Sequence, residues 1–421
     1  MLPSPPNAPA PDGAGAPVAG AERLVVLDVL RGVALFGILV VNMGAFRGAA
    51  HPVVDEARFP GTTARLAEGV VTWLAQGKFF PLFSFLFGYG LIVQRARAGA
   101  GGRWGPRIAR RLIGLGVLGV LHGVLAFSGD ILLTYALAGA VLVALALADD
   151  RTVRITAVVL VATSAVVTAA TAAGLNALAW ADGGAEGIAG DAAVTAGRYR
   201  SGSFLTVTGQ RAVELAIATV AQFPLGAFTT VLGVMAAGLL AGRAGLFSRP
   251  GRYRRPLERA RAWGLAVGLV GGLVFAVVTG LLGGREPTAS ITTAVFAATA
   301  VGTLTAPFLT AGLVASVALV RHRGRGRLLR ALAPAGRMAL TNYLAQSAVC
   351  SLLFSGYGLG WYGRVGPLAG LALATAVFAA QGLASHLWLR TFAVGPVEWL
   401  LRWFTYGRRP SFRSRTTRVA A

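Results

Sequence analysis

Cysteine and lysine are nearly absent from this sequence of 421 residues, in which Cys350 and Lys78 are the single examples of each. One cysteine excludes an intramolecular disulfide and a metal site built from thiolates. Charged side chains make up only 13% of the chain, which is about half of their share in soluble domains. The composition therefore excludes an ordinary soluble globular protein.

Several catalytic motifs are missing as well. The sequence contains no P-loop, no HExxH, no CxxC and no GxSxG. Each of these motifs depends on residues at a fixed spacing, so the corresponding nucleotide-hydrolase, metalloprotease, redox and serine-hydrolase chemistries are not expected. No metal site and no permanently bound cofactor are predicted.

Long apolar segments are abundant. Hydrophobic residues make up 55% of the chain and the mean hydropathy is +0.66. Ten stretches are long enough to cross a bilayer, which predicts an all-α fold, a polytopic membrane helix bundle of about ten transmembrane helices. The stretches are 24–45, 69–93, 109–127, 130–148, 152–178, 212–241, 262–283, 291–319, 337–356 and 366–389. The segment 212–241 is overlong and contains Pro224, which predicts a kink or a re-entrant start.

Arginines concentrate in alternate connections between these stretches. The net charge of +23 would suggest nucleic acid in a soluble chain, but clusters at 94–111, 242–261, 320–337 and after residue 389 are typical of membrane topology. The positive-inside rule places both termini in the cytoplasm. No nucleic-acid partner is expected, and the bilayer of the cell membrane is the predicted partner.

The predicted organisation has three parts. Residues 1–22, rich in Pro, Ala and Gly, form a disordered cytoplasmic tail. Residues 23–389 form the transmembrane bundle, and residues 390–421 form a basic cytoplasmic tail. Within this tail a short helix at 396–405, with a Glu398–Arg402 pair, is expected to lie in the membrane interface.

The first apolar stretch contains Asp28, Arg31 and Asn42. A charge near the membrane interior is costly unless it has a partner or reaches water. Arg31 and Asn42 share a helix face, and Asp28 is one turn before Arg31. These residues either form an interfacial ion pair with an asparagine between helices, or they line a site.

His122 lies in the third stretch, and Asp130 follows at the start of the fourth. Histidine is suited to proton transfer near neutral pH, and a nearby carboxylate could orient it. A hydrogen bond between helices is the alternative for His122, and His51 is a weaker candidate base. Asp130 is also predicted to cap the fourth helix. With the predicted sidedness, Asn42, His122 and Asp130 meet near the outer leaflet.

A further set of polar residues falls inside apolar segments and is predicted to line a cavity. Lys78 is either an interfacial anchor or such a lining residue, and Asn342 and Gln346 share a helix face that suits packing or lining. The set is Lys78, Tyr135, Asn342 and Gln346.

Five ordered blocks resemble the YeiB-like family of bacterial inner-membrane proteins. The blocks are LDVLRGVALFGILVVN, QGKFFPLFSFLFGYGL, LHGVLAFSGDILLTYALAG, GRMALTNYLAQ and GPVEWLLRWFTYG. More distantly, the chain is similar to the transmembrane acyltransferase superfamily, which includes the heparan-glucosamine N-acetyltransferase and cell-surface O-acyltransferases. Many of its members begin with LDxLRGx and carry a histidine eleven residues after the arginine, where this chain has Asn42.

The resemblance implies an acyltransferase that moves an acyl group from cytoplasmic acyl-CoA, such as acetyl-CoA, to an envelope glycan or lipid outside. Arg31, paired with Asp28, would bind the anionic donor, and Asn42 would donate to the thioester carbonyl. His122, oriented by Asp130, would be the general base. A small-solute transporter, with ionisable residues along its path, and a non-catalytic assembly partner are the alternatives.

Overall fold

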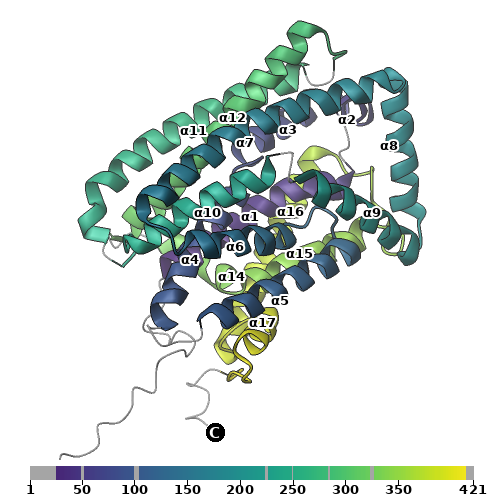
Figure 1. Ribbon diagram of the computed structural model, residues 1–421. Coiled ribbons are helices and arrows are strands. Elements are labelled where there is room, and N and C mark those ends of the chain that lie inside the picture. Colours follow the sequence, from purple (N-terminus) through teal and green to yellow (C-terminus); the bar gives the residue numbers. More distant parts are fainter. Residues whose placement is uncertain are drawn as a thin grey trace, which may run out of the picture.

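The protein is an all-α bundle in a computed structural model (Figure 1) that describes residues 25–48, 52–98, 104–222, 226–248, 250–282, 285–322 and 327–413. The tail predicted at 1–22 and His51 lie outside the described residues, as does the end of the basic tail. Within the described ranges there is no β-strand element, only an isolated bridge between Phe392 and Arg413. The predicted fold class is confirmed.

Seven helical segments are long and apolar enough to cross a membrane, and three apolar helices are shorter. The long ones are α1 (Val25–Arg47), α3 (Thr62–Leu74) together with α4 (Phe79–Ala98), α5 (Trp104–Leu125), α7 (Asp150–Ala181), α11 (Arg254–Leu282), α12 (Ala289–His322) and α16 (Pro367–Thr391). The shorter ones are α6 (Leu132–Leu145), α10 (Ala227–Arg243) and α15 (Ala339–Phe354). Together they correspond in order to the ten predicted stretches.

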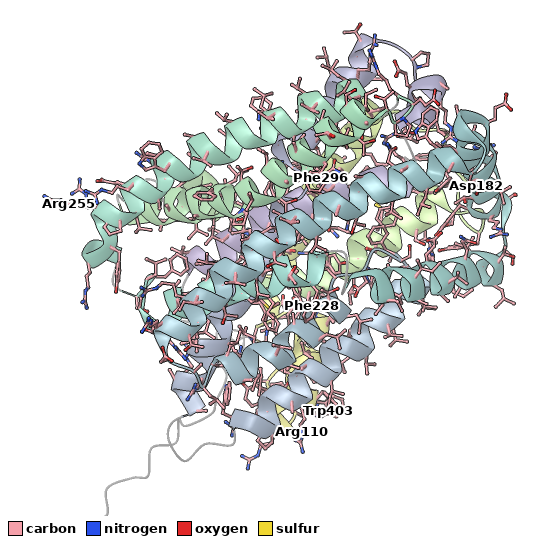
Figure 2. The ribbon with its side chains drawn as sticks, turned by 45° about the horizontal axis from the view of Figure 1, so that its top comes forward. Arg110, Asp182, Phe228, Arg255, Phe296 and Trp403 are labelled. Atoms are coloured by element: carbon pink, nitrogen blue, oxygen red, sulfur yellow. The ribbon has the colours of Figure 1, made fainter. Side chains whose placement is uncertain are left out.

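The remaining helices lie mainly at the ends of the bundle. They are α2 (Pro52–Arg58), α8 (Gly184–Ser201), α9 (Phe204–Gln222), η2 (Pro250–Tyr253), α13 (Arg327–Arg330), α14 (Ala333–Arg337) and α17 (Pro396–Tyr406). In Figure 1, α8 stands across one end of the bundle and α17 lies at the other. Figure 2 shows Asp182, just before α8, and Arg255, at the start of α11, at opposite ends of the molecule. Which of these ends faces the cytoplasm stays a prediction of the positive-inside rule.

Two predicted segments are divided in the structure. The stretch 212–241 was expected to contain a kink or a re-entrant start near Pro224, and it is divided there: α9 ends at Gln222 and α10 begins at Ala227, after Gly226 in a left-handed conformation (φ 80°). The connection 179–211 contains α8 and the start of α9.

The second stretch is interrupted by a turn at Gln76-Gly77-Lys78, where Gly77 has φ 74°. Lys78 is buried, and its ammonium donates to the carbonyl oxygens of Thr72 (3.1 Å) and Gln76 (2.9 Å). Cations are favourable at a helix C-terminus, so this lysine stabilises the end of α3. It does not line the cavity described below.

Glycine allows the central helices to approach closely. A Cβ at Gly88 of α4 would lie 1.9 Å from the carbonyl oxygen of Met235 in α10, and a Cβ at Gly238 would lie 2.0 Å from that of Phe85. Small residues at helix crossings are typical of membrane bundles. In the same way, Gly336 of α14 packs directly against the backbone of α1 at Asp28.

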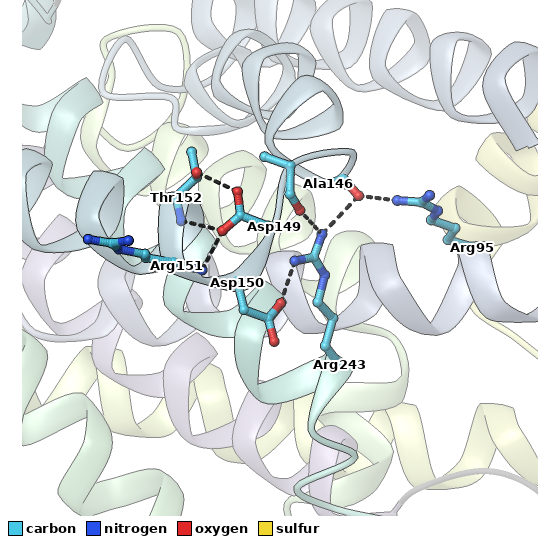
Figure 3. Close-up of polar contacts among 8 residues, drawn as sticks. Arg95, Ala146, Asp149, Asp150, Arg151, Thr152 and Arg243 are labelled. Carbon is cyan, nitrogen blue, oxygen red and sulfur yellow. Dashed lines mark hydrogen bonds and ion pairs between the residues drawn. The ribbon is translucent and has the colours of Figure 1, made fainter.

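Arginines satisfy the carbonyl groups at the end of α6 (Figure 3). Arg243 donates to the carbonyl oxygens of Ala146 (3.0 Å) and Ala148 (2.9 Å) and pairs with Asp150 (2.6 Å), while Arg95 also donates to Ala146. Asp149 caps α7, and the hydroxyl group of Thr152, which donates to it, lowers the pKa of this carboxyl group. This cluster holds the α6–α7 turn and is structural.

The sidedness generates a first prediction. Single cysteines at Ser290 and at Ser248, each in a Cys350→Ser background, should differ in reactivity toward an impermeant maleimide added to intact cells. Ser290, at the start of α12, should be labelled because 284–290 is a poorly basic connection, whereas Ser248 should be protected. The reverse pattern would invert the predicted topology.

Candidate functional site

His122 and Asp130 form a buried pair between α5 and α6. The Nδ1 atom of His122 is 2.7 Å from Oδ1 of Asp130, and the two side chains are 2% and 0% exposed. The other oxygen, Oδ2, accepts a hydrogen bond from the backbone N–H of Leu133 (2.9 Å) in the first turn of α6. Gly119 makes this approach possible, because a Cβ there would lie 2.8 Å from Oδ2. The carboxylate therefore holds the histidine and the start of α6 together.

Tyr343 of α15 completes this group. Its hydroxyl group donates to Oδ1 of Asp130 (3.5 Å), and its ring lies 4.8 Å from the imidazole of His122, centroid to centroid. A carboxylate surrounded by donors acts only as an acceptor, which assigns the Nδ1 proton to His122. The Nε2 atom is then the basic nitrogen, and it is buried with no hydrogen-bond partner among the described residues.

A cavity of about 380 Å³ lies beside this group. Its apolar end is formed by residues of four helices that meet near the His122–Asp130 pair. They are Ile38, Leu115, Ile131, Leu132, Tyr135 and Tyr343. Tyr343 thus faces the cavity and contacts both members of the pair. His122 and Asp130 do not themselves line the cavity, so Tyr343, Ile131 and Leu132 separate them from it.

The other end of the cavity, at the predicted cytoplasmic side, is strongly basic. We call its six arginines the arginine cluster: Arg31, Arg97, Arg107, Arg111, Arg337 and Arg402. Two carboxylates accompany them. Asp28 pairs with Arg31 (3.0 Å), and Glu398 of α17 accepts from the backbone N–H of Leu340 (2.7 Å) at the start of α15. The cavity therefore carries an excess of positive charge.

Arg111 of α5 lies close to two other members of the arginine cluster. Its Nε atom is buried without a hydrogen-bond partner in the described structure, and its guanidinium stacks over the ring of Phe87 at 5.8 Å. Arg31 and Arg402 are near enough for their charges to act on it. Like charges held together in a semi-enclosed space favour an anionic ligand, and guanidinium groups match phosphates and carboxylates.

Of the predicted site residues, Tyr135 lines this cavity, whereas Asn342, Gln346 and Asn42 do not. Tyr135 lines the cavity and donates to the carbonyl oxygen of Phe80 (2.7 Å). Asn342 does not line it: its amide donates to the carbonyl oxygen of Ala335 and to Ser385, so it joins α15 to α14 and α16. Gln346 is buried outside the cavity lining. The side chain of Asn42 is half-buried, one turn beyond the cavity residue Ile38 on the same face of α1.

Sequence reasoning did not select Tyr343, Arg111 or Glu398 as site residues. Tyr343 stands directly after Asn342 in the GRMALTNYLAQ block, but sequence alone does not show which of two neighbouring polar residues faces a cavity. Arg111 was counted only as part of a basic connection. Glu398 was paired with Arg402, whereas its carboxylate also accepts from Thr341 Oγ1 (2.5 Å).

Comparison with known proteins adds a family. A family described as "Protein of unknown function (DUF418)" matches residues 241–408. The chain is 34% identical to "Uncharacterized protein YxaH" of Bacillus subtilis over 408 residues, covering 91% of this chain and 94% of that protein. It is 32% identical to "Uncharacterized protein YeiB" of Escherichia coli, covering 94% of this chain and all of YeiB. No solved structure has significant similarity to the chain.

The double role of Asp130 generates a stability prediction. Asp130→Ala removes the cap of α6 and leaves the buried Nδ1–H of His122 without an acceptor, so it should lower the free energy of unfolding by about 1–3 kcal/mol. Asp149→Ala removes only an exposed cap and is the matched control. Denaturant titration in micelles should show the smaller loss for Asp149→Ala; equal losses would mean that the buried pair adds no stability.

Proposed function

The chain belongs to the family of YeiB and YxaH, and we propose that it is a multi-pass membrane acyltransferase of the bacterial cell membrane. The donor is an acyl thioester of coenzyme A that enters from the cytoplasm. The acceptor is a hydroxyl or amino group of an envelope glycan or lipid on the outer side.

One observation supports this proposal above the others. A single cavity has the arginine cluster at one end and, at the other, Tyr343 in contact with the His122–Asp130 pair. Acyl-CoA has the same polarity, because its phosphates are far from its thioester. The phosphates would bind the arginine cluster, and the acyl group would occupy the apolar end. If the arginine cluster and Tyr343 lined two separate cavities, a single acyl-CoA molecule could not reach both, and this donor would not be proposed.

The chemistry follows from the orientation of His122. Nε2 is buried and His122 does not line the cavity, so the proposal requires the Tyr343 side chain to move and let the acceptor group reach it. Nε2 then accepts the proton of the acceptor group while the acceptor oxygen or nitrogen attacks the thioester carbonyl carbon. The tetrahedral intermediate collapses, the carbon–sulfur bond breaks, and the thiolate leaves and takes the proton from the imidazolium. Asp130 stabilises the imidazolium and fixes its tautomer. Asn42, on the face of α1 that also carries Ile38, is the proposed donor to the carbonyl oxygen as negative charge develops.

Donor binding gives a direct test. Arg31→Ala and Arg111→Ala should each weaken acetyl-CoA binding by about 10- to 100-fold, the loss expected for one charge-assisted hydrogen bond. Arg31→Lys should not restore it, because an ammonium lacks the planar fork. Native mass spectrometry or calorimetry of the purified protein measures the binding.

Arg255→Ala is the matched control for these variants. This arginine is exposed at the start of α11, far from Arg110 and Trp403, which lie together at the α5–α17 edge (Figure 2). Its removal should leave binding unchanged. Equal affinity of the parent and both cluster variants for acetyl-CoA would remove the donor from the proposal and would favour transport or assembly.

The catalytic step has its own test. His122→Ala and His122→Gln should both abolish transfer of labelled acetyl groups to membrane material while acetyl-CoA still binds. Asp130→Asn should slow transfer less, because its other contacts persist. Glutamine can still form a hydrogen bond between helices but cannot act as a base at neutral pH. Full activity of His122→Gln would show that His122 is a packing residue.

A further inference from the structure

The turn that joins α5 to α6, residues 125–130, carries Asp130 and follows His122 by one helical turn. It is held from one side by α9, whose second half falls within the predicted apolar stretch 212–241. Leu215 of α9 packs against Gly123, where a Cβ would lie 2.6 Å from the leucine side chain. This close contact brings the polar face of α9 against the end of α5.

Arg211 of α9 is the first of two polar contacts to the turn. The residue is only 3% exposed, and its guanidinium donates to the carbonyl oxygen of Leu125 (3.0 Å). The same group donates to Tyr357 (2.9 Å) and to Ser355 (3.0 Å) in the connection after α15. A cation at the C-terminus of a helix stabilises its free carbonyl groups, so Arg211 fixes the end of α5.

Glu214, one turn after Arg211, makes the second contact. Its Oε2 atom accepts from Ser128 (2.7 Å) and from Tyr199 of α8 (2.6 Å), while Oε1 accepts from Gln210 (3.0 Å). Burial raises the pKa of Tyr199, and the hydrogen bond that this tyrosine donates to Glu214 raises it further. Ser128 is two residues before Asp130, so this carboxylate holds the middle of the turn.

The opposite face of α9 is apolar and exposed at Leu205, Val213, Ile217 and Val220. Arg211 and Glu214 lie on the other face and make their contacts within the protein, where Arg211 is buried and Glu214 is half-buried. Burying a charged side chain in a membrane protein is costly, and apolar packing residues could fill the same space. Apolar packing is not directional, whereas the hydrogen bonds of Arg211 and Glu214 are. These hydrogen bonds can therefore fix the position of the turn in a way that apolar residues could not.

We propose that Arg211 and Glu214 are positioning residues for His122. They hold the turn so that Asp130 stays on Nδ1 of the imidazole and Nε2 remains the basic nitrogen. The catalytic meaning of this role rests on the proposed function, whereas the tautomer of His122 can be measured whether or not the protein transfers acyl groups. Arg211 and Glu214 act through the turn and are not catalytic residues.

The experiment uses nitrogen-15 histidine spectra of the full-length protein in lipid nanodiscs. The chain has 4 histidines, so replacing His51, His322 and His386 by glutamine leaves the signal of His122 alone. The parent should show protonated Nδ1 and bare Nε2. Arg211→Gln and Glu214→Gln should each lower the ratio of this tautomer to the other by about fivefold, the effect expected when one hydrogen bond is lost.

Two further variants make the result specific. Ser128→Ala removes only the hydroxyl group that donates to Glu214, so it should shift the ratio in the same direction without the risk of misfolding that a buried arginine carries. Arg198→Gln is the matched control, because Arg198 is exposed and contacts α9 only through Gln210 (2.7 Å). Its tautomer ratio should equal that of the parent.

An unchanged ratio in both Ser128→Ala and Glu214→Gln would overturn the proposal and leave α9 as packing alone, and so would an equal shift in Arg198→Gln. Transfer assays separate this outcome from failure of the proposed function. If acyl transfer is real, Arg211→Gln should lower kcat and leave acetyl-CoA affinity unchanged. If His122→Gln is fully active, the acyltransferase proposal fails, but the tautomer result still decides the positioning role.

Discussion

An ionised side chain inside a membrane bundle must have a partner, and the polar architecture of this protein follows from that cost. Lys78, Arg211 and Arg243 all donate to carbonyl oxygens near helix ends, where the backbone already provides partial negative charge. Asp130 is the acidic counterpart, because it accepts from the start of α6 and from His122. Charged residues therefore fix where helices end, and the helix ends in turn fix the site.

The arginine cluster differs in the number of like charges that it brings together. Six guanidinium groups and two carboxylates line the same cavity; Asp28 pairs with Arg31, and Glu398 accepts from the N-terminus of α15. An anion bound there would offset the repulsion between the guanidinium groups, and a ligand that binds only the folded state contributes its binding free energy to stability. This excess of charge is the reason to propose an anionic ligand at the basic end of the cavity.

Features that depend on a local sequence pattern could be predicted from the sequence. Hydropathy located the ten apolar segments, the spacing of three residues predicted the Asp28–Arg31 pair, and the short connection between two helices brought His122 near Asp130. Features that depend on distant contacts were missed. Arg211 and Glu214 of α9 have partners in α5, α8 and the 355–357 connection. No window of sequence contains these partners.

One helix, α15, contributes to both ends of the cavity. At the basic end, Glu398 of α17 accepts hydrogen bonds from Leu340 and Thr341 at the start of α15. At the other end, Tyr343 of the same helix contacts His122 and Asp130, whose turn is held by α9. Coupling between two sites needs a shared structural element, so in the proposed transfer reaction α15 is the helix through which donor binding at α17 would act on Tyr343.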